Sequence, residues 1–210
     1  MREDVPLLEV ADLECWRGDR RLFRGLSFAI DSGEAAQITG PNGSGKTTLM
    51  RALCGLTRPQ AGELRWRGEA VEQSSSAFRA GILYLGHENG LKSELSAMEN
   101  LRALTDIAGR PRAVSPEQGL ARLDLLDYAD QPVRTLSSGQ RRRVALARMA
   151  LVDASLWLLD EPFTALDERG VELVNGLFDE HLTGGGALLF TSHSPVALTS
   201  GAPTKIGLNQ

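Results

Sequence analysis

A glycine-rich run at residues 40–48 restricts the possible folds more than any other part of the sequence. It reads GPNGSGKTT and fits the pattern Gly-x-x-x-x-Gly-Lys-[Ser/Thr]. The preceding EAAQIT is expected to be a strand, and a helix is expected to begin at KTTLMRAL. A strand, a glycine loop and a helix in this order are typical of a phosphate-binding loop. Glycines allow backbone N–H groups to converge on phosphate oxygens at the start of the helix.

Two side chains of this run extend the predicted phosphate site. Lys46 is expected to reach the β- and γ-phosphates as a positive charge, and the hydroxyl of Thr47 is a candidate Mg²⁺ ligand. The pattern does not distinguish kinases, GTPases, motors and transport ATPases, but no Asn-Lys-x-Asp sequence is present to read guanine. The candidate nucleotide ligands in the run are Gly40, Pro41, Asn42, Gly43, Ser44, Gly45, Lys46, Thr47 and Thr48.

Two adjacent carboxylates end an apolar strand in LWLLDEP, residues 156–162. Beside the phosphate loop, Asp160 is expected to hold Mg²⁺ directly or through water, since Mg²⁺ prefers hard oxygen ligands. Glu161 would then polarise the attacking water as a general base. The competing interpretation is a solvated strand end followed by a proline. A second apolar strand, LLFTSH, ends at His193, which is expected to contact the γ-phosphate.

Strand and helix signals alternate along the rest of the chain. Strands are expected at residues 7–15, 24–30, 34–40, 62–71, 82–86, 156–160 and 186–193. The second and third of these form either a β-hairpin or two separate strands. We predict an α/β fold of phosphate-loop NTPase type, with a mainly parallel core sheet, an N-terminal antiparallel β-part and a helical insertion. Residues 1–210 are expected to form one domain, with a helical subdomain at about 88–150.

Helix-start signals lie within the predicted subdomain. Ser96 with Glu99, and Ser115 with Gln118, fit the capping box, in which each side chain accepts a hydrogen bond from the other residue's backbone N–H. Pro116 at the first helical position strengthens the second of them. The second helix is expected to carry an apolar stripe formed by Leu120, Leu123 and Leu126.

A small polar loop meets a strong helix in TLSSGQRRRVALARM, residues 135–149. The loop holds no nucleophile with an obvious base and no metal cluster, so its own residues do not indicate what function it serves. The arginines in Arg17–Arg24 and Arg141–Arg143 are expected to form solvated faces or local anion contacts.

Composition excludes several classes of protein. The net charge of −4 provides no global basic field for nucleic acid. No apolar run approaches the roughly 20 residues needed to span a bilayer, and the first residues carry no secretory signal pattern. The two cysteines, Cys15 and Cys54, are far apart and are expected to be reduced thiols. The chain is therefore expected to be cytosolic unless another subunit carries it to a membrane.

Five segments in a characteristic order resemble those of ABC-type ATPase domains: GPNGSGKT, LSSGQ, LWLLDEP, TALD and TSH. The resemblance covers nearly the whole chain. It implies that ATP and Mg²⁺ bind at the phosphate loop, and that LSSGQ completes the ATP site of a second copy in a head-to-tail pair. Asp167 in TALD is implied to carry contacts between the two sites. The ligands implied for the partner's ATP are Ser137, Ser138, Gly139 and Gln140.

Two positions depart from the ABC pattern. His87 stands where most such ATPases place a glutamine, and either binds Mg²⁺ or positions water as a neutral imidazole, or is a tolerated substitution. Near the adenine, the usual aromatic residue falls at or beside Arg17, with Trp16 next to it. Either side chain can stack on a purine, so the choice between them stays open at this point.

A narrower resemblance follows from CWRGDRRLFRGLSF, LGHENGLKSELSAMENL and EPFTALD, which look like ATP-binding subunits of cytochrome c maturation (haem) exporters. It implies a peripheral subunit at the cytoplasmic face of the bacterial inner membrane, paired with integral permease subunits that contact residues 88–110. Haem would be handled only indirectly, because the chain has no C-x-x-C-H motif. The alternatives are a soluble ABC-type ATPase, such as an iron–sulfur assembly factor, and an ATP-sensing module. The sensing module is disfavoured because it needs no base at Glu161.

Overall fold

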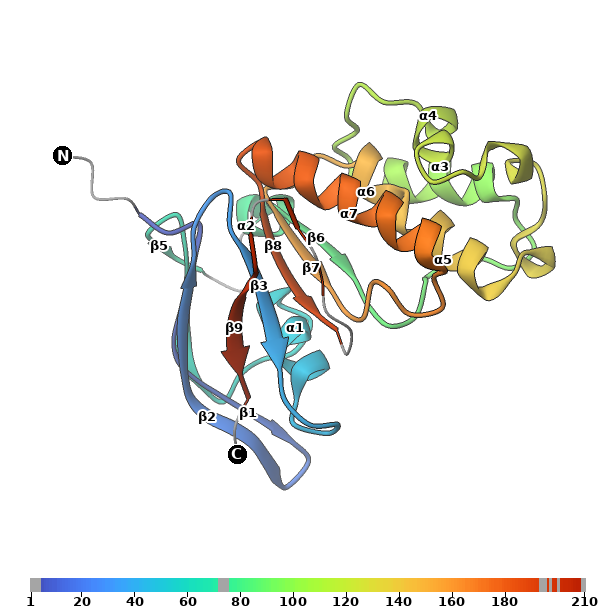
Figure 1. Cartoon of the computed structure of the whole chain (residues 1–210). Helices are drawn as coiled ribbons and strands as arrows, with labels where there is room; N and C mark the ends of the chain where they lie inside the picture. The colour runs from blue at the N-terminus through green and yellow to red at the C-terminus, as the bar shows by residue number, and fades with distance from the viewer. Residues whose placement is uncertain (1–4, 72–75, 193–195, 197, 200, 209–210) are drawn as a thin grey trace.

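Two β-sheets of different kinds share one hydrophobic core with helix α1 (Lys46–Leu53) in the computed structural model (Figure 1). The structure describes residues 5–71, 76–192, 196, 198–199 and 201–208. The antiparallel sheet has the order β2-β1-β4-β5, and the parallel sheet has the order β6-β7-β8-β3-β9. The strands of the antiparallel sheet are β1 (Leu8–Arg17), β2 (Arg20–Ile30), β4 (Ala61–Trp66) and β5 (Glu69–Ala70). Those of the parallel sheet are β3 (Ala35–Thr39), β6 (Ile82–Leu85), β7 (Leu156–Leu159), β8 (Ala187–Thr191) and β9 (Thr204–Gly207). The predicted fold class is confirmed.

Strands β2 and β3 do not form a hairpin, so of the two readings of this segment, two separate strands is the correct one. β2 pairs with β1, whereas β3 pairs with β8 and β9 in the other sheet. The turn between them contains Gly33 with φ of +84°, whose N–H donates to Gly186 O at 2.8 Å. That bond attaches the turn to the loop before β8. The chain thereby passes directly from one sheet to the other.

Strand β7 is buried on both faces, which separates two hydrophobic cores. Leu156 and Leu158 belong to the core shared by both sheets and α1. Trp157 and Leu159 face the other core, which α7 (Glu168–Thr183) covers (Figure 1). Because successive side chains of a strand point to opposite faces, a four-residue apolar run is what a central parallel strand requires.

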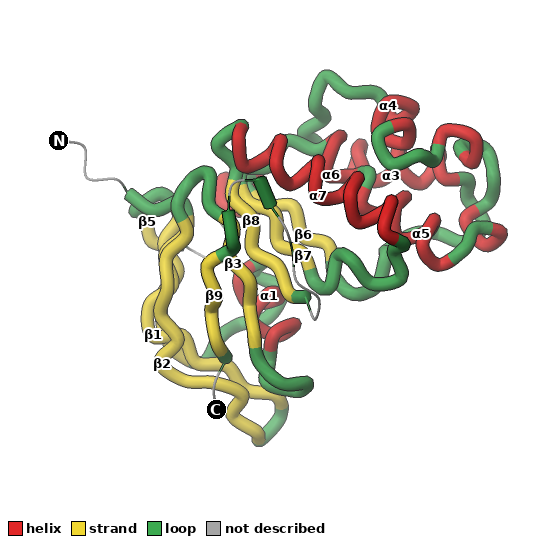
Figure 2. Tube along the Cα trace, viewed as in Figure 1, coloured by secondary structure: helices red, strands yellow, loops and turns green. Residues whose placement is uncertain are grey.

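The helices between residues 97 and 151 lie to one side of the sheets (Figure 2). Both predicted capping boxes are present, since Ser96 and Ser115 each exchange side-chain hydrogen bonds with the residue three positions on. The predicted leucine stripe is correct only in part. Asp124 adopts φ of +52° beyond the end of α4, and Leu126 is 50% exposed in a short 3₁₀ turn. These helices are α3 (Ala97–Ala108), α4 (Pro116–Ala121), α5 (Ser138–Leu146) and α6 (Arg148–Leu151).

None of the helices in the described part of the chain combines the length and apolar character needed to cross a bilayer.

Candidate functional site

The glycine-rich run forms a tight loop between β3 and α1, as its pattern predicts. Gly40 adopts φ of +148°, and a Cβ at this position would lie 2.8 Å from Ser44 Oγ. Gly45 caps α1 with φ of +105°, and its Cβ would lie 3.0 Å from the Cβ of Leu22. Larger residues would therefore force the loop open at both points. The loop turns the first N–H groups of α1 toward one side of the molecule.

Two polar groups of the loop are suited to a phosphate. Lys46 Nζ donates to the carbonyl oxygens of Gly40 at 2.8 Å and Pro41 at 3.3 Å, so the ammonium group lies within the loop. Ser44 Oγ is buried and has no hydrogen-bond partner among the described residues. Buried hydroxyls in proteins are nearly always hydrogen-bonded. A hydroxyl without such a partner inside a glycine-rich loop is therefore suited to donate to an anionic ligand.

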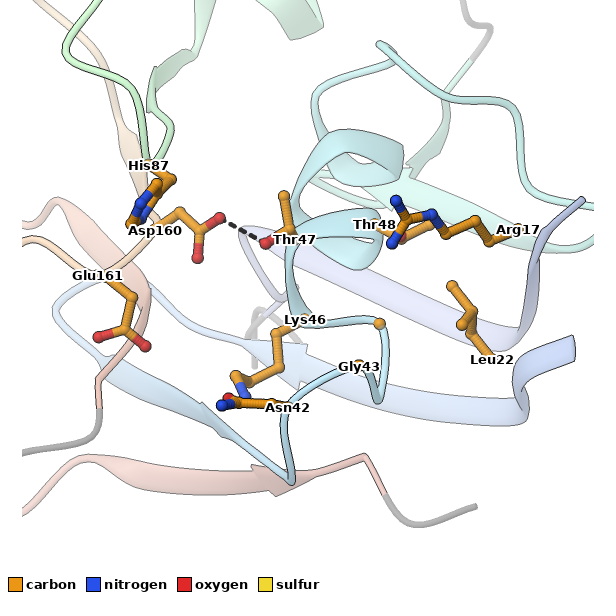
Figure 3. A pocket seen from close by; sticks show the side chains of 11 residues that line it. Arg17, Leu22, Asn42, Gly43, Lys46, Thr47, Thr48, His87, Asp160 and Glu161 are labelled. Carbon is orange, nitrogen blue, oxygen red and sulfur yellow. Dashed lines mark hydrogen bonds between the residues drawn. The ribbon is translucent and has the colours of Figure 1, made fainter. Parts of the chain in front are cut away.

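The loop borders a cavity of about 310 Å³, which contains residues from four parts of the chain (Figure 3). In Figure 3, Glu161 and His87 lie at the end of the cavity opposite Arg17. His87 is exposed and thus accessible from the cavity. Many of the predicted site residues therefore meet in space. The lining residues are Arg17, Leu22, Asn42, Gly43, Gly45, Lys46, Thr47, Thr48, His87, Asp160 and Glu161.

Asp160 lies at the end of β7 with both carboxylate oxygens engaged. Thr47 Oγ1 donates to Oδ2 at 2.7 Å (Figure 3), and Thr191 Oγ1 donates to Oδ1 at 2.7 Å. No group of three or more His, Cys, Asp or Glu side chains that could hold a metal occurs in the described ranges. Mg²⁺, however, commonly takes only one or two protein oxygens together with substrate phosphates. The hydroxyl of Thr47 and the carboxylate of Asp160 fit that requirement.

Glu161 follows Asp160 in a left-handed backbone conformation, with φ of +50°. Its N–H donates to Thr191 Oγ1 at 2.8 Å, and its carbonyl accepts from Arg142 Nη2 at 2.8 Å. A non-glycine residue adopts such a φ only where its surroundings impose it. These two bonds fix the peptide groups on both sides of the Glu161 Cα. The side chain is thereby held at the cavity.

The two candidates for stacking on a base occupy different environments. Arg17 lines the cavity, and Trp16 does not. The indole Nε1 of Trp16 donates to Glu14 Oε1 at 2.7 Å, and its backbone N–H donates to Gln60 Oε1 at 3.0 Å. Of the two, Arg17 has the position from which a guanidinium could lie over a purine.

The LSSGQ residues lie at the start of α5 and do not line the cavity of their own chain. Ser137 Oγ accepts from the Gln140 N–H at 3.1 Å, and Gln140 Oε1 accepts from the Ser137 N–H at 2.8 Å. This is a third capping box, which the sequence interpretation missed although Ser-x-x-Gln is its ordinary signal. Gly139 lies close to the loop that precedes α7, since a Cβ at residue 139 would lie 2.7 Å from Ala165 O.

Of three other predicted site residues, two lie in the described part of the chain. Asp167 is the N-cap of α7, where its carboxylate accepts from the Gly170 N–H at 2.8 Å. Ser138 lines a smaller cavity together with His87, away from the phosphate loop. His193 lies outside the described residues.

Arg142 contradicts the expectation that Arg141–Arg143 forms a solvated face. Its side chain is 3% exposed and donates to Gly86 O at 3.1 Å, Asp160 O at 2.9 Å and Glu161 O at 2.8 Å. Helical spacing was the available signal, because residue 142 shares a face with Leu146 and Met149, which are also buried. The three consecutive arginines obscured this periodicity.

A phosphate loop, a strand-end carboxylate and a serine-capped helix define a nucleotide-binding domain of the ABC class. The family described as ABC transporter matches residues 23–164. A structure of a putative ABC transporter (ATP-binding protein) from Pyrococcus furiosus aligns with a TM-score of 0.79 and 26% identity, covering 96% of each chain.

Two curated relatives narrow the class. "Cytochrome c biogenesis ATP-binding export protein CcmA" of Methylococcus capsulatus is 47% identical over 191 residues, covering 90% of this chain and 92% of the relative. The protein of the same name from Escherichia coli K12 is 43% identical over 206 residues, covering 98% of both. The chain belongs to the ABC transporter family and, within it, to the CcmA group of ATP-binding subunits.

Proposed function

We propose that this chain is the ATP-hydrolysing subunit of a membrane complex in c-type cytochrome biogenesis, of the haem-transporting class of translocases. The observation that carries ATP hydrolysis is the Thr47–Asp160 hydrogen bond of 2.7 Å at the mouth of the phosphate loop. It brings a loop hydroxyl and a strand-end carboxylate together where a nucleotide-bound Mg²⁺ would lie. The cytochrome role is supported by the names of the relatives that match almost the full chain.

Within the cavity, each residue has a distinct part. The backbone N–H groups of the loop hold the phosphates, and Lys46 exchanges its bonds to Gly40 O and Pro41 O for bonds to the β- and γ-phosphates. Thr47 and Asp160 would hold Mg²⁺, which when bound would neutralise charge on the phosphates. Glu161 accepts a proton from water as the water oxygen bonds to the γ-phosphorus. The bond to the β–γ bridging oxygen breaks, which yields ADP and inorganic phosphate.

A second copy of the chain completes each site. Ser137, Ser138 and Gly139 do not line the phosphate-loop cavity of their own chain, although they stand at a helix N-terminus suited to an anion. In a head-to-tail homodimer these residues, together with Gln140, face the γ-phosphate held by the partner's loop. Asp167, at the start of the neighbouring helix α7, lies between the two sites.

Other parts of the chain would connect the ATP site to the membrane subunits. We take residues 1–210 as one ABC domain, with residues 88–150 as its helical subdomain and residues 88–110 as the segment that contacts permease subunits. The complex would place the chain at the cytoplasmic face of the inner membrane. Haem would be moved or released by the membrane partners and not bound by this chain.

The ATPase assignment is tested with the full chain and its Glu161→Gln variant. Glu161→Gln should bind Mg·ATP as the parent does and hydrolyse it about 10²- to 10⁴-fold more slowly. A variant that turns over ATP at the parent rate would refute the role of Glu161.

The membrane role is tested separately, by affinity purification of the tagged chain from detergent-solubilised cells. Integral membrane subunits should co-purify in stoichiometric amounts. Recovery of a soluble scaffold that carries iron–sulfur clusters would instead support the soluble alternative.

A further inference from the structure

Arg142, on the second turn of α5, is a buried cation with an unusual set of partners. Its guanidinium makes five hydrogen bonds to described residues, four of them to main-chain carbonyl oxygens. The fifth goes to the side-chain oxygen of Asn89 at 3.0 Å. Burial lowers the pKa of this guanidinium, while the nearby charges of Asp160 and Glu161 raise it. An apolar side chain would pack at lower desolvation cost, so the site retains a group that is expensive to bury.

The five acceptors belong to two segments that carry the proposed chemistry. Gly86 and Asn89 flank His87 and Glu88 in the loop that follows strand β6. The other three acceptors are the consecutive carbonyl oxygens of Asp160, Glu161 and Pro162. Arg142 itself belongs to the helix that begins with the LSSGQ residues. One guanidinium therefore joins three segments that lie far apart in the sequence.

Arg142 also bears on the conformation of Glu161. The backbone of Glu161 has φ of +50°, and Arg142 and Thr191 hold the two peptide groups on either side of its Cα. Without the bond from Arg142, the carbonyl of Glu161 would lose its shorter hydrogen bond and keep the 3.3 Å bond from the Thr164 N–H, so the positive φ of Glu161 would be held less firmly. The direction of the carboxylate depends on that φ.

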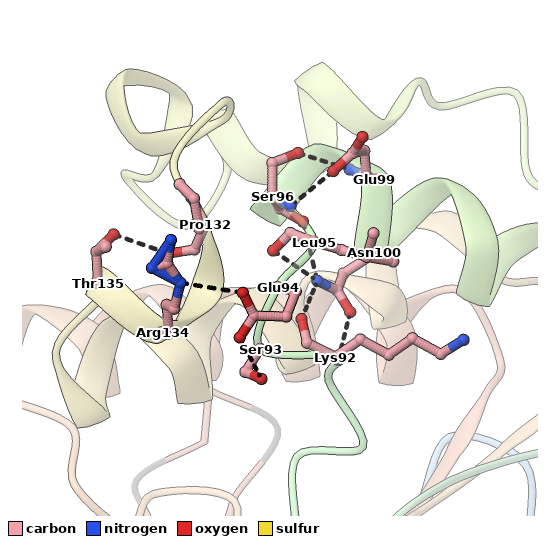
Figure 4. A network of polar contacts seen from close by, with 10 residues as sticks. All are labelled: Lys92, Ser93, Glu94, Leu95, Ser96, Glu99, Asn100, Pro132, Arg134 and Thr135. Carbon is pink, nitrogen blue, oxygen red and sulfur yellow. Dashed lines mark hydrogen bonds and ion pairs between the residues drawn. The ribbon is translucent and has the colours of Figure 1, made fainter.

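The far end of the loop after β6 is attached to the same helical region (Figure 4). Asn100 on α3 accepts from the Lys92 N–H at 2.8 Å and donates to Lys92 O at 3.0 Å. Arg134 pairs with Glu94 at 3.2 Å and lies in the short turn directly before the LSSGQ residues. The loop is thus held at Asn89 by Arg142 and, further along, by Asn100 on α3 and by Arg134 just before α5.

We propose that Arg142 is a positioning residue for ATP hydrolysis, which sets the backbone of Glu161 and of the His87 loop according to the position of the LSSGQ helix. The inference rests on the proposed function, in which Glu161 is the base and LSSGQ meets the partner's nucleotide. When a second copy engages the start of α5, the displacement reaches both segments through one rigid, planar group. Hydrolysis is thereby favoured only in the closed pair.

The experiment compares Arg142→Gln and Arg142→Lys in the full chain with Arg143→Gln as the matched control. Arg143 is the next residue of the same helix, and its hydrogen bond goes to Leu123 O at 2.8 Å, away from the cavity. For each variant, kcat and KM for ATP, Mg·ATP affinity and Tm are measured. Arg142→Gln should lower kcat about 10- to 100-fold, with KM and affinity within about twofold of the parent. Arg142→Lys keeps the positive charge but lacks the planar guanidinium with its several N–H donors. Its kcat should lie between those of Arg142→Gln and the parent.

A second variant, Asn89→Ala, separates the two attachments. It removes the side-chain contact of Arg142 with the His87 loop and leaves the bonds to the carbonyl oxygens of Gly86, Asp160 and Glu161, so its kcat should fall less than that of Arg142→Gln. If the Arg142 variants lose ATP affinity by the same factor as kcat and also have a lower Tm, the role of Arg142 is merely structural and the inference is overturned. An unchanged kcat in Arg142→Gln would also overturn it. If Glu161→Gln is inactive in the same assay, the proposed function survives that result; if Glu161→Gln is fully active, both fall.

Discussion

Thr191, at the end of β8, donates a hydrogen bond of 2.7 Å from its hydroxyl to Oδ1 of Asp160, at the end of β7. The same oxygen of Thr191 accepts the N–H of Glu161 at 2.8 Å. One buried hydroxyl therefore orients the proposed metal-binding carboxylate and anchors the residue after it. Neighbouring parallel strands make this possible, because their carboxyl ends meet at one edge of the sheet.

Replacing Thr191 with valine should weaken both stability and activity. Valine keeps the shape but leaves Asp160 Oδ1 and the Glu161 N–H without this partner, which costs about 1–3 kcal/mol in the free energy of unfolding. Chemical denaturation measures that loss, and the Mg²⁺ concentration needed for half-maximal ATPase activity should rise. Thr191→Ser retains the hydroxyl and serves as the control. A valine variant that matches the serine variant in both measurements would contradict the assigned role.

Two glycines on helices should respond to alanine in opposite ways. At Gly139 a Cβ would lie 2.7 Å from Ala165 O, so Gly139→Ala must displace the loop before α7 and should cost about 1–3 kcal/mol of stability, with lower ATPase activity. At Gly176, within α7, a Cβ meets nothing within 4 Å, so Gly176→Ala should stabilise by about 0.5–1 kcal/mol. Thermal unfolding and steady-state ATPase assays measure both. Equal effects at the two positions would refute the close contact at Gly139.

Arg17 should contribute to nucleotide binding more than Trp16 does. Arg17 lines the cavity, whereas the indole of Trp16 is hydrogen-bonded to Glu14. Arg17→Ala removes a cation–π contact and should raise the dissociation constant for ATP about 2- to 30-fold. Trp16→Ala should leave this constant within about twofold of the parent value. Isothermal titration with Mg·ATP gives both dissociation constants. The reverse order would assign the stacking to Trp16.

His87 lines the cavity beside Asp160 and Glu161, so its side chain should affect turnover. If it positions water or Mg²⁺, His87→Ala should lower kcat about 10- to 100-fold, whereas His87→Gln keeps a polar side chain and should retain part of the rate. Steady-state ATPase assays measure both variants. An alanine variant that turns over ATP at the parent rate would show that the histidine is a tolerated substitution.

His181 should make the stability of the fold depend on pH. It stacks on Trp157 with ring centroids 3.8 Å apart, and burial lowers the pKa of its imidazole to about 4. The usual value is about 6.5, so between these values the unfolded chain binds a proton that the folded chain does not. The stabilising contribution is complete above about pH 6.5 and is lost as the pH falls toward 4, by about 2 kcal/mol between pH 7 and pH 5.

The measurement is denaturant unfolding of the parent and of His181→Gln at both pH values. The difference in unfolding free energy between parent and variant should shrink by that amount at the lower pH. A constant difference for His181→Gln would refute the assignment.

Local patterns in the sequence were sufficient to predict the phosphate loop, the buried strand β7 and the capping boxes at Ser96 and Ser115. Each depends on residues within a few positions of one another: glycines that permit unusual φ values, a short apolar run, or a serine three residues before Glu or Gln. The expected meeting of Thr47 and Asp160 also came from the sequence, because a phosphate loop and a strand-end carboxylate are parts of one recurrent site.

The tertiary structure alone decided the long-range features. Nothing near Arg142 in the sequence shows that its guanidinium meets Gly86 and Glu161, and nothing near Thr191 shows that it holds Asp160. The separation of β2 and β3 into different sheets is of the same kind. A buried polar side chain is satisfied by whichever backbone groups the packing brings near it. Its partners are therefore set by the assembly of strands and helices, and not by the order of residues along the chain.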